Sequence, residues 1–272
     1  MEAPFLDEID WRRPWLASVR ETAESILRTT DWRAALDDAA LCSGLFNHRG
    51  MPIRFVLQSD LPPGTAYEAY ISASGCVPTR DNLHDFFNAL VWLTFPRIKV
   101  RLNAIQASEI AHNETSTSPK VRGGVRDAAT IFDENAALLV LRDAEMLDAF
   151  RAHRWIEVFM DRREVFGREC EVWLFGHALM EKLVRPYKAI TAHAWPVLAD
   201  SEFFSLPESE KTAWIDEAVS RQLTGNLANS SFTPLPVLGV PDWWDGQDRG
   251  FYDDLSVFRP KRRDSRGPLR DI

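Results

Sequence analysis

The amino-acid sequence predicts an α+β protein that is mainly helical, with a few short antiparallel strands or hairpins. Segments with helical spacing of apolar residues outnumber strand-like segments, and the strand-like segments come in hairpin-like pairs without βαβ alternation. The stretch "SSFTPLPVLGVPDWWDGQDRGFYDDLSVFRPKRR" is dense in proline, glycine and aromatic residues. We therefore expect an extended Pro- and Trp-rich tail that lies over the body.

The first half of the chain supplies most of the predicted helices. "PWLASVRETAESILRTT" and "DWRAALDDAALCSG" read as two helices, the second capped by Thr30 or Asp31 and ended by Gly44. "RFVLQ" and "YEAYIS" read as strands joined by a Pro-Pro-Gly turn. Helices are expected over 79–96 and over "RIKVRLNAIQASEI", with Pro96 between them. Residues 112–124 are polar and read as a mobile loop.

The second half mixes strands and helices. "ATIFDENAALLVL" reads as two strand-like runs around a turn at 133–136, and "CEVWLF" as a strand that leads into the helix "HALMEKLV". Helical segments are expected around "DAEMLDAFRAH" and "WIEVFMDRREVFG". The pattern "SLPESEKTAWIDEAVSRQLTGN" predicts a helix with Ser205 as cap, Pro207 in the first turn and Gly225 after its end.

Length and composition limit the class of protein. The 272 residues can bury a substantial core, and we expect one globular domain over 1–258, with helices over 10–44 peripheral to it and a basic, flexible tail over 259–272. The net charge of −8 weighs against nucleic-acid binding, which depends on clustered lysine and arginine. Three scattered cysteines, an acidic N-terminus and no long apolar run predict a cytoplasmic protein that does not enter a membrane.

The predicted helix "TRDNLHDFFNALVWLTFP" carries an unusual polar face. At 100° per residue its apolar face holds leucine and phenylalanine, and its opposite face holds Asp81, His84, Asp85, Asn88 and Trp92. A solvated face would favour glutamate and lysine, which form helices better than histidine, aspartate and asparagine. The face is therefore either a plain solvated surface or the wall of a ligand site, where His84 and Asn88 address one ligand or metal.

A second histidine occurs in "FGHALMEKL". If a helix begins near Gly176, His177 and Glu181 share one face, one turn apart. The helix dipole disfavours the cationic form of a histidine at this end, which leaves a neutral imidazole that can bind a metal. The alternative is a contact within the helix between the two side chains.

Acidic residues complete the set of candidates. Asp133 and Glu134 fit the polar requirements of a hairpin turn, and carboxylates beside histidines are also what divalent-metal sites contain.

Two further residues each allow two interpretations. Arg126 forms either a surface ion pair or a site that holds the negative charge of a substrate. His193 is either a packed histidine or part of a substrate site.

The motifs together resemble one family. "VPTRDNLHDFFNALVWLTFP", Leu102-Asn103, "RDAATIFDEN", "FGHALMEKL" and "VLGVPDWW" are similar to the bacterial domain of unknown function 3025 family, from about residue 54 to about residue 260. The sequence has Ala136 where the family pattern leads us to expect a glycine after "DEN". The resemblance implies a cytoplasmic bacterial setting, and it implies no reaction mechanism.

The hypothesis from the sequence is a metal-assisted hydrolase that acts on a small or anionic substrate. The expected metal ligands are His84, Asp85, His177 and Glu181. Asp133 or Glu134 supplies a further ligand or a general base, and Lys99 or Arg126 holds developing negative charge. The residues expected to contact substrate are Asn88, Trp92, Asn103 and His193.

The rival hypothesis is a non-catalytic binding or assembly protein. In it the same histidines and carboxylates form a buried polar network that fixes the packing of two helices. The tryptophan-rich segment around Trp243 and Trp244 then faces a protein partner.

Overall fold

The structure is a computed structural model that describes residues 4–115 and 123–261. Its larger sheet has four strands in the spatial order β4 (Cys170–Leu174), β3 (Ala136–Leu141), β5 (Thr191–Leu198) and β6 (Thr233–Pro236). Strand β3 pairs antiparallel with β4 and parallel with β5, and β5 pairs antiparallel with β6. All six residues of β3 are apolar and buried, which is why this strand lies in the interior of the sheet.

A second, two-stranded sheet lies apart from the first. Its strands β1 (Arg54–Leu57) and β2 (Cys76–Thr79) run parallel, and the chain between them includes helix α3 (Tyr67–Ser74). Helix α3 ends at Gly75, whose φ of +76° is a left-handed conformation that glycine adopts without strain.

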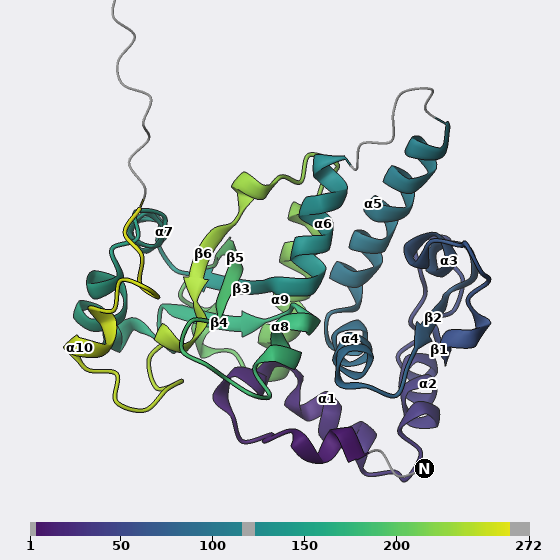
Figure 1. The fold of residues 1–272 in the computed structure, drawn as a ribbon, viewed down its shortest axis with the longest axis horizontal. Helices are drawn as coiled ribbons and strands as arrows, with labels where there is room; N and C mark the ends of the chain where they lie inside the picture. Colours follow the sequence, from purple (N-terminus) through teal and green to yellow (C-terminus); the bar gives the residue numbers. More distant parts are fainter. Residues whose placement is uncertain (1–3, 116–122, 262–272) are drawn as a thin grey trace, which may run out of the picture.

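Helices fill the space between and around the sheets. The remaining α-helices are α1 (Ala17–Leu27), α2 (Trp32–Cys42), α4 (Leu83–Thr94), α5 (Pro96–Thr115), α6 (Gly124–Asn135), α7 (Ala144–Arg151), α8 (His177–Lys182), α9 (Glu208–Gln222) and α10 (Arg249–Tyr252). Short helical turns are η1 (Pro4–Glu8), η2 (Pro14–Leu16), η3 (Gln58–Asp60), η4 (Glu157–Asp161), η5 (Arg163–Val165), η6 (Phe203–Ser205), η7 (Asn229–Ser231) and η8 (Val237–Gly239). Figure 1 shows α4, α5 and α6 standing between the two sheets, with α7 and α10 at the far end of the larger one.

One glycine fixes how α8 meets α6. Helix α6 continues directly into β3, and the chain leaving β4 passes so close to this junction that a Cβ on Gly176 would lie 2.6 Å from backbone atoms of Asn135 and Ala136. The Gly176 amide also donates to the Ala136 carbonyl at 2.8 Å. Only glycine permits this approach. As a result α8 begins beside the last turn of α6, and it packs against both α4 and α6.

The predicted α+β class with a mainly helical content is confirmed. The helices predicted in the first 44 residues are α1 and α2, and Asp31 caps α2 by accepting from the Ala34 amide. The expected helices over 79–96 and after Pro96 are α4 and α5, and α7, β4, α8 and α9 also lie where the patterns predict them.

Several local predictions are wrong. "YEAYIS" is helix α3, so it forms no hairpin with β1; its buried Ile71 and Ser72 face the protein interior through helical packing. "ATIFDEN" is the end of helix α6 rather than a strand and a turn, because Ala128, Ala129 and Phe132 bury one helical face. The pairing is not purely antiparallel, since β1 with β2 and β3 with β5 are parallel.

The remaining differences concern ends and omissions. Strand β5 has no counterpart in the prediction. Helix α9 has Pro207 rather than Ser205 at its cap and ends at Gln222, before Gly225. The predicted loop begins inside α5, and its residues 116–122 lie outside the described residues, as do residues 262–272 of the predicted basic tail. The Pro- and Trp-rich segment contributes β6 to the sheet, and Val237 and Leu238 are buried.

No helix in the described part of the chain is long and apolar enough to cross a membrane.

Candidate metal centre

His84 is held at the start of α4 by local capping. The Asn82 side chain accepts from the Asp85 amide at 2.8 Å and begins the helix. Asp85 is buried and accepts from the backbone amide of Arg80 at 2.7 Å and from its guanidinium at 2.9 and 3.0 Å. Burial pushes the pKa of Asp85 upward, but the hydrogen bonds from Arg80 outweigh it and the pKa is lowered. The Asp85 carboxylate therefore binds Arg80, and it is not one of the three side chains whose ligand atoms come together.

His177 is the first residue of α8 and is buried. Its Nε2 lies 3.1 Å from Nε2 of His84, although the two residues are 93 positions apart. Burial lowers the pKa of His177 to about 3, with Lys99 and His84 adding to the decrease and Asp133 opposing it. The imidazole is therefore neutral and can offer a nitrogen lone pair.

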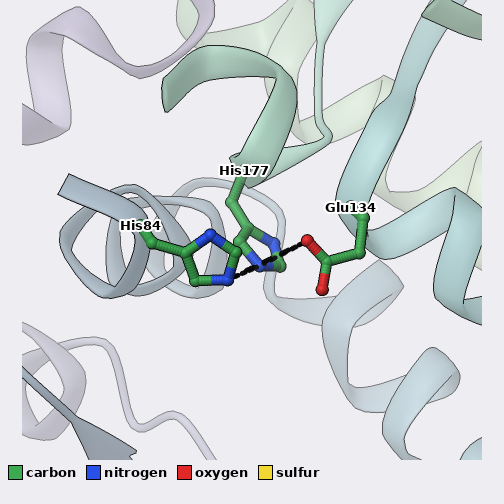
Figure 2. Close-up of side chains that lie close together, drawn as sticks. All are labelled: His84, Glu134 and His177. Atoms are coloured by element: carbon green, nitrogen blue, oxygen red, sulfur yellow. Dashed lines mark hydrogen bonds and ion pairs between the residues drawn. The ribbon is translucent and has the colours of Figure 1, made fainter. Parts of the chain in front are cut away.

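Glu134 in the last turn of α6 completes the group. Its Oε2 lies 3.4 Å from Nε2 of His177 and 3.9 Å from Nε2 of His84. Burial, followed by the neighbouring Asp133 carboxylate, raises the pKa of Glu134. Figure 2 shows the three side chains reaching from different elements toward one point. We call His84, Glu134 and His177 the metal triad, because their ligand atoms all lie within 4.8 Å of one another.

The metal triad has the dimensions of a metal site. Its three donor atoms are separated by 3.1, 3.4 and 3.9 Å. The point equidistant from the corners of such a triangle lies about 2.0 Å from each corner, and zinc–nitrogen and zinc–oxygen bonds are about 2.0 to 2.2 Å long. An ion held by these residues would have all three donor atoms at bonding distance.

The outer nitrogen of each histidine faces a carboxylate. Nδ1 of His84 lies 2.9 Å from Oε2 of Glu181, which is one turn after His177 on α8. A carboxylate only accepts, so Nδ1 of His84 carries the proton and Nε2 presents its lone pair to the triad. Nδ1 of His177 lies 4.0 Å from Oδ2 of Asp133.

The outer nitrogen of His177 is buried and has no hydrogen-bond partner among the described residues. Its distance of 4.0 Å from Oδ2 of Asp133 is too long for a hydrogen bond. A cation held by the triad would take the Nε2 lone pairs of both histidines, and the His177 proton would then be on Nδ1, on the side of the Asp133 carboxylate. Carboxylates behind both histidines are the surroundings that metal-binding histidines usually have.

A second polar group is more deeply buried. It includes Asp133, the residue before Glu134, and Asn88, one helical turn after His84. Lys99 Nζ donates to Oδ1 of Asp133 at 2.6 Å and to Oδ1 of Asn88 at 2.8 Å, and Asn88 donates to the Tyr67 hydroxyl at 3.0 Å. Burial pushes the pKa of Asp133 up, but Lys99 and His177 outweigh it and the pKa is lowered. We call Tyr67, Asn88, Lys99 and Asp133 the inner network. The Lys99 ammonium also lies 5.2 Å from the centre of the Trp92 ring.

Glu68 belongs to this region and the sequence analysis missed it. Its Oε2 accepts from Nδ2 of Asn103 at 2.6 Å. Burial and the nearby Asp133 carboxylate raise the pKa of Glu68 to about 7, with Lys99 and Asn103 opposing the increase. A helical reading of "YEAYIS" would have placed Tyr67 and Glu68 at the start of a helix, where both could face one site.

The structure thus brings some predicted site residues together and separates others. His84, His177 and Glu134 meet directly, with Glu181 on His84, and Asp133, Lys99 and Asn88 lie behind them. Asp85 pairs with Arg80. Asn103 contacts Glu68. Arg126 lowers the pKa of Glu68 rather than facing the triad. His193, on β5, is exposed, and its Nδ1 accepts from the Asn135 side-chain amide at 3.0 Å.

The comparisons with known proteins identify a family. Residues 53–262 match the model described as "Protein of unknown function (DUF3025)". The match covers more than half of the chain, so the chain belongs to the DUF3025 family, as the sequence motifs predict. No curated protein and no solved structure matches the chain.

Proposed function

We propose that the chain is a metal-dependent hydrolase whose ion is held by His84, His177 and Glu134. The observation that carries the proposal is the triangle of donor atoms with edges of 3.1, 3.4 and 3.9 Å. Two imidazoles and one carboxylate with a remaining open position are the ligand set of catalytic zinc hydrolases, and iron or manganese tolerates the same donors. Zinc is the ion that this donor set suits best.

The chemistry of such a site is the activation of water. A bound divalent ion lowers the pKa of its water from about 15.7 to about 7 and polarises a carbonyl or phosphoryl oxygen. His177 stays neutral because it is buried, and Glu181 orients His84. The remaining groups with suitable chemistry are Lys99, which carries positive charge behind the triad, and Glu68, which holds or releases a proton near neutral pH. We propose a small or anionic substrate that the ion itself would attract, because Lys99 is already paired with Asp133.

The rival function is a structural one, in which the cluster fixes the packing of α4, α6 and α8. The inner network supports it, because Lys99 and Asp133 already neutralise each other without any ligand. The metal triad argues against it, since it leaves a buried His177 nitrogen unpaired toward a carboxylate. Trp243 and Trp244, the proposed partner-facing residues, are half-buried and pack against the core. We therefore favour the metal-dependent reading.

The setting we propose is the bacterial cytoplasm, with residues 1–258 as one domain. All three cysteines are free thiols, which fits a reducing compartment.

Metal content tests the proposal first. Elemental analysis of protein purified without chelator is expected to give close to one zinc, manganese or iron per chain, and His177→Ala is expected to lose it. His153→Asn is the matched control, because His153 lies outside the triad at a φ of +56°, which asparagine tolerates. A metal-free wild-type protein would contradict the proposal.

An activity assay tests the second part of the proposal, that the protein is a hydrolase. The metal-loaded protein is expected to cleave members of a panel of phosphate, carboxylic and amide esters, and Glu134→Gln is expected to abolish the activity. Metal binding without any cleavage would leave the metal centre standing and would overturn the hydrolase assignment.

A further inference from the structure

A cavity of about 660 Å³ lies away from the metal triad. It is open to solvent and is bordered by the chain that follows α2, the end of α4, the first half of α5 and the last turns of α9. None of its lining residues belongs to the metal triad or the inner network. Its volume falls within the range of about 300 to 1,000 Å³ that is typical of small-molecule sites.

The charge of the cavity wall is opposite to that of the protein. Three guanidinium groups line it, from Arg97, Arg101 and Arg221, against the single carboxylate of Glu217. The whole chain has a net charge of −8. A basic cavity in an acidic protein concentrates anions locally.

A carboxylate already occupies the space between two of these arginines. Glu217 is ion-paired with both Arg97 and Arg221, whose side chains are 63% and 77% exposed. Arg101 is held at the wall by its Nε, which donates to the Leu223 carbonyl at 2.8 Å. The guanidinium fork matches carboxylate and phosphate groups, so Glu217 occupies the position that the head of an anionic ligand would take.

Apolar side chains line the rest of the cavity. Leu45 is buried, Leu93 and Val100 are partly buried, and Phe46 remains 52% exposed although it is a large aromatic residue. Ala104 contributes only a methyl group, which leaves room beside α5. An exposed phenylalanine over an apolar wall is suited to cover the apolar part of a ligand.

We propose that this cavity binds an organic anion with an apolar body. The head group, a carboxylate or a phosphate, pairs with Arg97 and Arg221 in place of Glu217, and the body lies along Leu93, Val100 and Phe46. A neighbouring cavity of about 430 Å³ shares residues 44–46 with this one. It is lined by Asp37 and Asp38, so we do not assign the anion to it. The site is independent of the metal centre, so its failure would leave the proposed hydrolase intact.

Calorimetric titration with a matched series of ligands tests the charge requirement. Decanoate and decyl phosphate are expected to bind at least about tenfold more tightly than decanol or decylammonium, because only the anions form charged hydrogen bonds with the guanidinium groups. The comparison of the two anions tells which head group the site prefers. Equal binding of decanoate and decanol, or no binding of either anion, would overturn the proposal.

Two substitutions are expected to act in opposite directions. Arg97→Gln should weaken decanoate binding about tenfold, whereas Glu217→Gln should strengthen it, because it removes the competing carboxylate. Arg185→Gln is the matched control, since Arg185 pairs with Glu8 far from the cavity lining and is 82% exposed. If the cavity were only an apolar surface, decanoate affinity would change in neither variant. Weaker decanoate binding by Glu217→Gln would contradict the proposed competition between Glu217 and the ligand head group.

Ala104→Trp tests the location, because its ring would fill the cavity and should abolish binding of decanoate. Circular dichroism and metal content are measured on each variant to show that the fold persists. Undiminished binding by a folded Ala104→Trp protein would place the ligand elsewhere and overturn the assignment.

Discussion

The metal triad and the inner network share helices α4 and α6, yet they differ in their electrostatics. Asp133 and Glu134 are neighbours in α6, and His84 and Asn88 are one turn apart in α4. In the inner network, Lys99 and Asp133 have side chains only 4% and 11% exposed and form an ion pair of 2.6 Å. In the triad, three groups that offer lone pairs face one another, and the side chains of His84 and Glu134 are 29% and 38% exposed.

The difference shows which of the two groups satisfies its charges and hydrogen bonds within the chain. A buried charge needs an opposite charge or hydrogen bonds, and the inner network supplies both from within the chain. In the triad, Nδ1 of His177 is buried and has no hydrogen-bond partner among the described residues. We therefore expect the inner network to stabilise the fold, and we propose that the triad receives an ion.

Removing the cation of the inner network should have the largest effect on stability. Lys99→Met leaves Asp133 buried without its partner, and we expect the free energy of unfolding to fall by about 3 to 5 kcal/mol. Urea unfolding measures it. Lys188→Met is the control, because the Lys188–Asp254 pair of 2.8 Å is about one-third exposed and should contribute much less to stability. Equal losses in the two variants would remove the contrast between buried and exposed pairs.

Loss of the carboxylate behind His84 should have an intermediate effect, and on metal affinity rather than on the fold. Glu181→Ala frees the His84 ring to change its orientation and tautomer, so we expect about 10- to 100-fold weaker zinc binding. A zinc titration measures the affinity. Lys182→Ala on the same helix should leave it unchanged, and an unaltered affinity in Glu181→Ala would show that Glu181 does not position His84.

Asp85 should show the smallest effect. Asp85→Asn weakens the contacts with Arg80, and we expect a loss of about 1 kcal/mol in unfolding free energy. Zinc affinity should stay the same, because the carboxylate is bound by the Arg80 guanidinium. Asp81→Asn is the control, since Asp81 pairs with Arg33 at the surface. If Asp85→Asn loses zinc, Asp85 is a ligand and the triad is misassigned.

The sequence could predict part of this comparison. The polar face of 79–96 and the pair His177 and Glu181 were recognisable because helical spacing is a local property. The end of α6 was read as a hairpin turn, because Thr130, Ile131 and Phe132 are good strand formers and only packing decides for a helix. Glu134 was therefore a candidate for the wrong structural reason.

Long-range contacts set the rest. The proximity of His177 to Glu134 depends on the close approach of Gly176 to Asn135 and Ala136 across 40 residues. Glu68 reaches the site because α3 packs against α5. The pairing of Asp85 with Arg80 removes a plausible ligand from the site. Periodicity within one segment does not encode such contacts.

Equilibrium dialysis of zinc against metal-stripped protein tests the central claim most directly. The wild-type protein and Asp85→Asn should each bind one zinc ion per chain, and His84→Ala, His177→Ala and Glu134→Ala should each lose the tight site while remaining folded. Retention of one tightly bound zinc in all three triad variants, or absence of tight binding in the wild-type protein, would contradict the account.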